Sequence, residues 1–385
     1  MIAKISTRDG YGKRLAELEN PDIVVLTADL ADSCRVKAFA EKYPARFIQV
    51  GISEQDMLGI ANGLGLEGKI PLTNTFAGFV IRAHEQIRLI AINKSNVKVI
   101  GHHSGISLGP DGASQMCEED TSLFRTMPNF TVVSPCDALE AQKALDAIIK
   151  INGPCYLRLS REPGSIITNE YSDFKIGKAN ILKEGHDVLI VACGLLVQEA
   201  LRAAKILEEQ KIDACVMNMH TIKPLDKETL IRYAQKCKAV VTCEEHSIYG
   251  GLGSAVCEAL SLSKIPIKIL GIRDEFGESG RADELFVKFG LTAENIVEYC
   301  QDVIKFKDRT DKNMPTREVD EIVHDINGIN KAIQKESSEQ EKIRTAESRT
   351  SYDRDPRNRI TKMTPEQKAQ MDDVLNKMFG GRKNR

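Results

Sequence analysis

The chain has 385 residues, of which 42% are apolar and 28% charged, a composition typical of a folded protein of two or three domains. Its 53 basic and 55 acidic side chains leave a net charge of −2, which excludes a global field for nucleic acid or an anionic membrane, so local residues must hold any bound anion. The N-terminus lacks an apolar signal-peptide core, and no long uncharged apolar stretch occurs, so we expect neither export nor a membrane span.

Residues 1–170 alternate between apolar β-rich runs and helical patterns, which predicts an α/β domain with a mostly parallel sheet. We expect strands at 22–30, 46–52, 69–76, 96–103, 130–137 and 154–160. Helices are expected near 33–43, 54–66, 78–94, 114–127 and 137–151, with Arg8 placed before the first helix of the chain.

After a loop-like stretch near 162–182, the alternation restarts and predicts a second α/β domain over 171–306. Its expected strands lie at 187–194, 214–222, 239–246 and 265–272, and a glycine-rich segment at 249–255 opens a helix. Residues 307–385 form a charged tail, with 18 basic and 15 acidic side chains among 79. This composition predicts disorder, or two short amphipathic helices near 319–333 and from 364 onward.

Glu54 follows a predicted strand and opens a helix of small residues. A carboxylate in that position suits proton exchange with a bound heterocycle, although acidic residues also favour first helical turns through the helix dipole. Phe76 and Phe79 lie three residues apart and provide a flat platform for an aromatic ring, or an ordinary core pair. Arg82, in the helix that follows, is expected to face solvent.

The segment 101–120 concentrates polar side chains directly after a predicted strand, where open α/β sheets place ligand-binding loops. His103, Asp111 and Gln115 are its candidates for a polyol or phosphate. Arg8 and Arg161 also occupy loop positions, and arginine forks suit phosphate if the fold brings them together. The ten cysteines show no CxxC or CxxH spacing, which predicts buried free thiols, no metal site and a cytoplasmic location.

Several segments, in order, resemble the C-terminal half of transketolase over residues 1 to about 305. They include GISEQDM, NTFAGFVIRAHEQIR, HHSGISLGPDGASQM, LRLSREP and CEEHSIYGGLGSA. The resemblance implies a pyrimidine-binding domain and a transketolase C-terminal domain. In that family a glutamate bonds N1′ of the aminopyrimidine of thiamine diphosphate and promotes removal of the C2 proton; its match is Glu54. The ring-stacking aromatic matches Phe79, beside Phe76.

The resemblance also implies sugar-phosphate contacts at Arg8, Ser33, His103 and Arg161, and a donor-hydroxyl contact at Asp111. The next contact, often His in the family, is Gln115 in this chain. The family binds the diphosphate and Mg²⁺ through a further domain of roughly 270 residues, which exceeds what a 79-residue tail can hold. We therefore expect a companion chain that binds Mg²⁺ and completes the active site in a heterotetramer or similar oligomer.

The expected activity is transfer of a two-carbon ketol unit from a ketose phosphate to an aldose phosphate, as in the pentose phosphate pathway. Three alternatives stay open: a deoxyxylulose-phosphate synthase-like subunit, a keto-acid dehydrogenase beta-like subunit, and a noncatalytic scaffold whose tail recruits a partner. A nonphosphorylated or sulfonated sugar donor is also open, because the same basic pocket would accept another anion.

Overall fold

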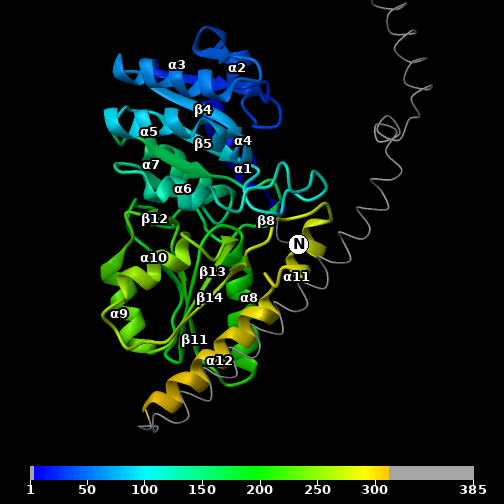
Figure 1. The fold of residues 1–385 in the computed structure, drawn as a ribbon, viewed down its shortest axis with the longest axis vertical. Helices are drawn as coiled ribbons and strands as arrows, with labels where there is room; N and C mark the ends of the chain where they lie inside the picture. The colour runs from blue at the N-terminus through cyan, green and yellow to red at the C-terminus, as the bar shows by residue number, and fades with distance from the viewer. Residues whose placement is uncertain (1–3, 312–385) are drawn as a thin grey trace, which may run out of the picture. The chain divides into compact units, whose positions relative to one another are not determined.

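Strands and helices alternate through the first half of the chain, and its strands, together with β12 from the second half, build a seven-stranded sheet in the order β12-β6-β7-β5-β4-β2-β3 (Figure 1). The computed structural model describes residues 4–311. All neighbouring strands of this sheet are parallel except β12 and β6. The strands are β2 (Ile23–Thr27), β3 (Phe47–Gln49), β4 (Ile70–Phe76), β5 (Lys98–His102), β6 (Thr131–Val133), β7 (Cys155–Arg158) and β12 (Thr221–Lys223).

Helices cover both faces of this sheet, as buried parallel strands require. One face packs a core that includes Tyr11, Phe39 and Leu145. Its helices are α1 (Thr7–Glu17), α2 (Lys37–Lys42) and α7 (Ala138–Ile149). The other face carries α3 (Glu54–Leu66), α4 (Ala77–Val80), α5 (His84–Asn93) and α6 (Asp120–Thr126). Short 3₁₀ turns follow α2 at Pro44–Arg46 and α4 at Ile81–Ala83.

A second sheet has five strands in the order β14-β13-β10-β11-β9, parallel except for β9. They are β9 (Asn180–Lys183), β10 (Val188–Ala192), β11 (Ala214–Asn218), β13 (Val240–Ser247) and β14 (Ile267–Ile272). Its helices are α8 (Leu196–Glu209), α9 (Lys227–Cys237), α10 (Leu252–Ala259), α11 (Ala282–Lys288) and α12 (Ala293–Asp311). A short antiparallel pair joins β1 (Lys4–Ile5) to β8 (Gly164–Ser165).

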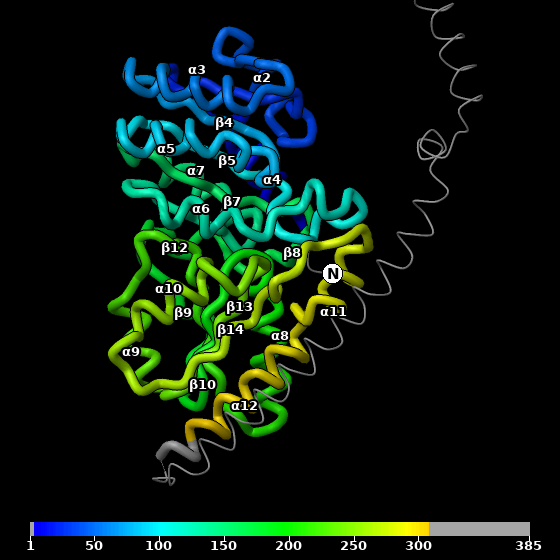
Figure 2. The backbone as a smooth tube through the Cα atoms, viewed as in Figure 1, coloured from blue at the N-terminus to red at the C-terminus, as the bar shows by residue number. Residues whose placement is uncertain are grey.

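The two sheets share a core. One buried cluster runs from Met57 and Ile87 beneath the first sheet to Leu189 in the second sheet and Val256 of α10. Strand β12 crosses back from the second half of the chain and completes the edge of the first sheet beside β6. Figure 2 shows the elements of the two sheets stacked one above the other, from blue to yellow along the chain. Residues up to Asp311 accordingly belong to one unit.

The predicted fold class of two successive α/β domains is confirmed. Three local predictions were wrong. Arg8 lies inside α1, because Ser6 caps the helix by accepting a hydrogen bond from the Asp9 backbone N–H. The helix expected at 114–127 begins at Asp120, and the stretch before it forms an isolated bridge with Gly105. The loop-like stretch at 162–182 contains β8 and the start of β9.

The predicted domain limits at 170 and 306 stay predictions. Helix α12 continues through Phe306 to Asp311. The two amphipathic helices expected near 319–333 and beyond 364 lie outside the described residues. Within residues 4–311, the longest and most apolar helices fall short of what a bilayer crossing requires.

Candidate active site

A cavity of about 510 Å³ opens at the carboxyl edge of the first sheet. It brings together eight residues singled out from the sequence, namely Arg8, Ser33, Phe76, Phe79, His103, Asp111, Gln115 and Arg161. Leu30, Asp32 and Arg35 complete its lining. Glu54 lies outside this lining.

Sheet topology explains why residues so distant in sequence meet. Strands β7, β5, β4 and β2 are neighbours, and each delivers a cavity segment just after its last residue. Phe79 follows β4, His103 follows β5, and Arg161 follows β7. Ligands bind outside the carboxyl ends of open parallel sheets because the connecting loops converge there.

Arg8 and His103 form the inner wall of the cavity. The Arg8 guanidinium donates from Nη1 to the Ser33 carbonyl at 2.9 Å and lies 3.0 Å from His103 Nε2. Burial, the neighbouring His102 and Arg8 together lower the pKa of His103 to about 2. Burial and the cations Arg35 and Arg161 lower the pKa of Arg8, although Asp9 opposes them. Arg8 is thus a cation among cations, an arrangement that a bound anion would stabilise.

Arg161 faces the cavity from the loop after β7. Its Nη1 donates to Asp111 Oδ2 at 2.8 Å and to the Leu108 carbonyl at 3.1 Å. Both side chains of the pair are about one third exposed, at 36% and 30%. The pair holds a carboxylate and a guanidinium side by side, one able to accept from a hydroxyl and the other able to bind an anion.

An aromatic wall also lines the cavity. The rings of Phe76 and Phe79 stack with centroids 5.2 Å apart, and Phe76 also stacks on His103 at 3.7 Å. Phe76 is buried, whereas Phe79 is partly exposed. Gly78 permits the close approach of the neighbouring loop, because an added Cβ would lie 2.9 Å from the Met116 carbonyl oxygen.

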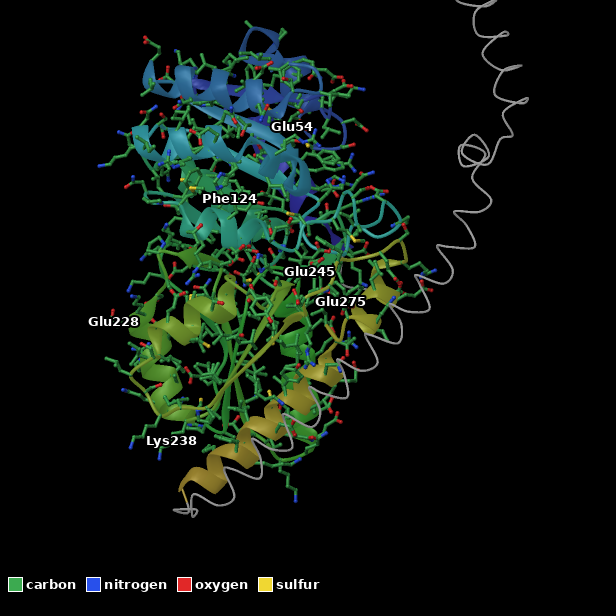
Figure 3. The ribbon with its side chains drawn as sticks, in the orientation of Figure 1. Glu54, Phe124, Glu228, Lys238, Glu245 and Glu275 are labelled. Atoms are coloured by element: carbon green, nitrogen blue, oxygen red, sulfur yellow. The ribbon has the colours of Figure 1, made fainter. Side chains whose placement is uncertain are left out.

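Glu54 is the first residue of α3 and is almost fully buried, at 2% exposure (Figure 3). Its Oε2 lies 3.4 Å from Arg82 Nη1 and accepts no hydrogen bond from residues 4–311. Arg82 also sits over the Phe79 ring, 5.3 Å from its centroid. Arg82 therefore links the buried carboxylate to the aromatic wall of the cavity.

Sequence reasoning missed three contributions to this site. Asp32 and Arg35 line the cavity, and Arg35 pairs with Asp9 at 2.6 Å. Arg82 is 53% exposed, as expected, but it also lies beside Glu54 and over the Phe79 ring. Asp32 lies between the strand predicted at 22–30 and the helix expected near 33–43, so its place at the cavity depends on the tertiary fold. Among the described residues, no group of three His, Cys, Asp or Glu side chains is arranged to hold a metal ion.

The fold and the cavity define a two-domain α/β protein with an arginine-lined, aromatic-walled site at a sheet edge. Family models for the transketolase pyrimidine-binding domain and the transketolase C-terminal domain match residues 3–164 and 177–296. The chain belongs to the transketolase family. Membership of that family implies thiamine diphosphate as the cofactor.

Several relatives resemble the chain over almost their whole length. The 6-deoxy-6-sulfo-D-fructose transketolase subunit of Clostridium sp. strain MSTE9 is 43% identical, over 78% of this chain and 95% of its own. An apulose-4-phosphate transketolase subunit of Phocaeicola vulgatus is 36% identical, over 78% and 97%. A solved structure described as a split gene transketolase, inactive beta4 tetramer, superposes with a TM-score of 0.74 at 44% identity, covering 79% of this chain and 99% of that chain.

Proposed function

We propose that this chain is one subunit of a split transketolase, which transfers a two-carbon ketol unit from a ketose phosphate to an aldose phosphate. The observation that carries the proposal is one cavity that unites three arginines, a neutral histidine and an aromatic wall. Its similarity to two transketolase subunits, each matched over nearly its full length, supports the proposal.

Glu54 and Phe79 fit the pyrimidine end of thiamine diphosphate. The Glu54 carboxylate is buried with an oxygen that accepts no hydrogen bond within residues 4–311, so a donor from a ligand would satisfy it. The partly exposed face of Phe79 offers a surface for the pyrimidine ring. When bound, the cofactor supplies the carbanion chemistry; Glu54 would hold a proton at its carboxylate and orient the ring.

Arg8 and Arg161 fit the anionic end of a sugar phosphate, together with Ser33 and His103 in the same cavity. His103 is neutral at physiological pH, and its Nδ1 has no hydrogen-bond partner among the described residues. Asp111 is placed to accept from a donor hydroxyl, and Gln115 supplies a neutral amide where a proton relay would need a titratable group. Either a phosphate or a sulfonate would satisfy this cationic set.

A companion chain would complete the site. We infer that it carries the diphosphate-binding domain and Mg²⁺, and that the two chains form a heterotetramer or similar oligomer. The outer face of α3 and α5 suits such a partner, because these helices expose the apolar side chains of Ile60, Leu66, Leu89 and Ile92. Ile52, two residues before Glu54, is also exposed. At Gly59 and Gly63 of α3 an added Cβ would meet nothing within 4 Å, so the helix backbone is open to close approach.

We further propose that the enzyme works in the cytoplasm, in exchange reactions of the pentose phosphate pathway. All ten cysteines are free and all but Cys257 are buried, which suits a reducing compartment.

The deciding experiment reconstitutes the chain with a companion chain, thiamine diphosphate and Mg²⁺, and measures ketol transfer between sugar phosphates. Glu54→Gln should lower kcat by about 100-fold or more, because proton exchange contributes roughly that factor, while the subunits still assemble. Glu199→Gln is a matched control, since Glu199 is buried on α8 and paired with Arg202 at 2.8 Å, outside the cavity lining. Unchanged turnover in Glu54→Gln would remove the proposed role.

A further inference from the structure

Residues 103–118, here termed the substrate loop, connect β5 to α6 and supply His103, Asp111 and Gln115 to the cavity. The loop has little regular structure of its own. Gly105 and Cys117 exchange two backbone hydrogen bonds of 2.9 and 3.3 Å at its base, and successive turns follow. A loop held in this way needs other contacts to fix the position of Asp111.

Those contacts come from the second sheet and its connections. Ile106, Leu108 and Met116 are buried in the same cluster as Ile190 and Leu270 of that sheet. The Glu118 carboxylate accepts a hydrogen bond from the Gly277 backbone N–H at 2.9 Å. The Glu118 backbone carbonyl accepts one from the Ser247 N–H at 2.7 Å. The loop that carries the substrate residues is therefore packed into the core of the other domain.

Glu245 makes the central polar contact. It lies near the end of β13, is 3% exposed, and accepts the Ser107 backbone N–H at Oε1, 2.6 Å away (Figure 3). The Glu245 carbonyl accepts from Arg158 Nη2 at 2.8 Å, and Arg158 is itself paired with Asp120 at 2.8 Å. The glutamate is thus fixed through its backbone as well as its side chain.

Gly105 shows how closely the loop and the carboxylate fit. Its φ is +74°, in the left-handed region, and an added Cβ would clash with the Glu245 carboxylate. Glu245 therefore meets the loop at both Gly105 and Ser107, shortly before Asp111 in the chain.

Resting on the proposed function, we propose that Glu245 is a positioning residue, a carboxylate of the C-terminal domain that sets the substrate loop for sugar binding. Loss of this acceptor would leave the buried Ser107 N–H unsatisfied, and the loop would shift to find a partner. A displacement of about 1 Å at Asp111 and Gln115 weakens substrate binding strongly, because transfer requires close alignment.

Glu244 offers a matched control in the same strand. It is equally buried, at 1%, and accepts two backbone N–H groups, those of Leu252 and Gly253 at 2.7 and 2.8 Å. These bonds hold the start of α10 and not the substrate loop. Substitution of either glutamate therefore removes a buried carboxylate with backbone donors, and of the two only the Glu245 side chain bonds to the loop.

The test measures hydrogen exchange in the full chain and kinetics in the reconstituted complex. Glu245→Ala should speed exchange in residues 104–118 and raise the donor-sugar KM about ten-fold, with the thiamine diphosphate affinity unchanged. Glu245→Gln, which keeps an acceptor, should show nearly wild-type exchange in residues 104–118 and a nearly wild-type donor-sugar KM. Glu244→Ala should speed exchange at 252–259 and leave the donor KM unaltered.

Wild-type exchange in the loop of Glu245→Ala would overturn the proposal, and so would faster exchange with an unchanged donor KM. The two hypotheses separate in this design. An inactive wild-type complex would contradict the proposed function, while the exchange measurement would still report whether Glu245 holds the loop.

Discussion

Arg8 Nη1 lies 3.0 Å from His103 Nε2, and this contact determines which imidazole nitrogen carries the proton. A guanidinium has no acceptor, so Nε2 must accept and the proton resides on Nδ1. Because burial and the neighbouring His102 and Arg8 lower the pKa of His103 to about 2, the ring stays neutral at physiological pH. His103 therefore acts as a hydrogen-bonding group and not as a cation.

Replacing Arg8 with methionine should raise the pKa of His103, because one source of repulsion for the imidazolium is removed. Burial is the larger cause, so the pKa should stay below the usual value of about 6.5. An NMR titration of the histidine Cε1–H signals measures the shift. His220, whose pKa is lowered to about 4 mainly by burial, serves as an internal control in the same spectra. If His103 moves no more than His220, the electrostatic link is refuted.

Asp111→Asn should lower kcat/KM for sugar phosphates about ten-fold, because the paired arrangement with Arg161 is lost in the cavity. Its effect on the free energy of unfolding should not exceed about 1 kcal/mol, as for other partly exposed ion pairs. Asp146→Asn is the matched control: the Arg14–Asp146 pair has a similar distance, 2.9 Å, and similar exposure, 32% and 35%, outside the cavity. Equal kinetic effects in both variants would argue against a role for Asp111 in binding.

Glu118→Gln should change how stability depends on pH. Burial raises the pKa of Glu118 to about 7, although the hydrogen bond from Gly277 opposes this shift. Because its pKa is higher in the folded state, Glu118 stabilises the fold fully below about pH 4.5. This stabilisation is lost as the pH rises through 7. The free energy of unfolding of Glu118→Gln, relative to that of the wild type, should therefore rise by up to ~1.4 kcal/mol per pH unit between pH 4.5 and 7.

Denaturant unfolding of both proteins at several pH values measures this difference. Glu184 provides a control of opposite sign, because the hydrogen bond from Lys236 lowers its pKa. The free energy of unfolding of Glu184→Gln, relative to that of the wild type, should fall as the pH rises. Parallel profiles for Glu118→Gln and the wild type would contradict the expectation.

Charges on the outer face of α3 should weaken assembly with the companion chain. Ile60 and Leu66 are 42% and 59% exposed, and a glutamate at either position would have to lose its hydration within an interface. We expect the affinity for the companion chain to fall at least ten-fold, measured by light scattering after size exclusion. Leu262→Glu, on a fully exposed apolar side chain near the end of α10, should assemble normally. The idea fails if all three variants assemble alike.

Continuous apolar runs made the sheets predictable, because buried parallel strands such as β2 and β10 pack apolar side chains on both faces. Helix α3 was predicted with its observed limits, since Glu54 and a periodic apolar pattern mark its start. The eight cavity residues were also chosen from local sequence and motif, and the fold places them together. Their catalytic and binding roles stay predictions.

Other features depend on contacts that no local pattern encodes. Glu245 meets Ser107 across 138 positions of the chain, and β12 reaches β6 from the other half of the molecule. The helix expected from residue 114 starts late because Cys117 pairs with Gly105, a tertiary bridge that competes with helical hydrogen bonds. Arg8 was predicted to precede the first helix. It lies inside α1 because Ser6, within the polar stretch at the N-terminus, caps the helix.

Strand β12 has a consequence for how this protein can be divided by an experimenter. It covers β6, so cutting the chain near residue 170 would leave β6 as a bare edge, with backbone groups free to pair with another molecule. The same cut would strip Ile106, Leu108 and Met116 of their apolar surroundings. We expect the isolated first half to aggregate, so the two sheets must be produced together on one polypeptide.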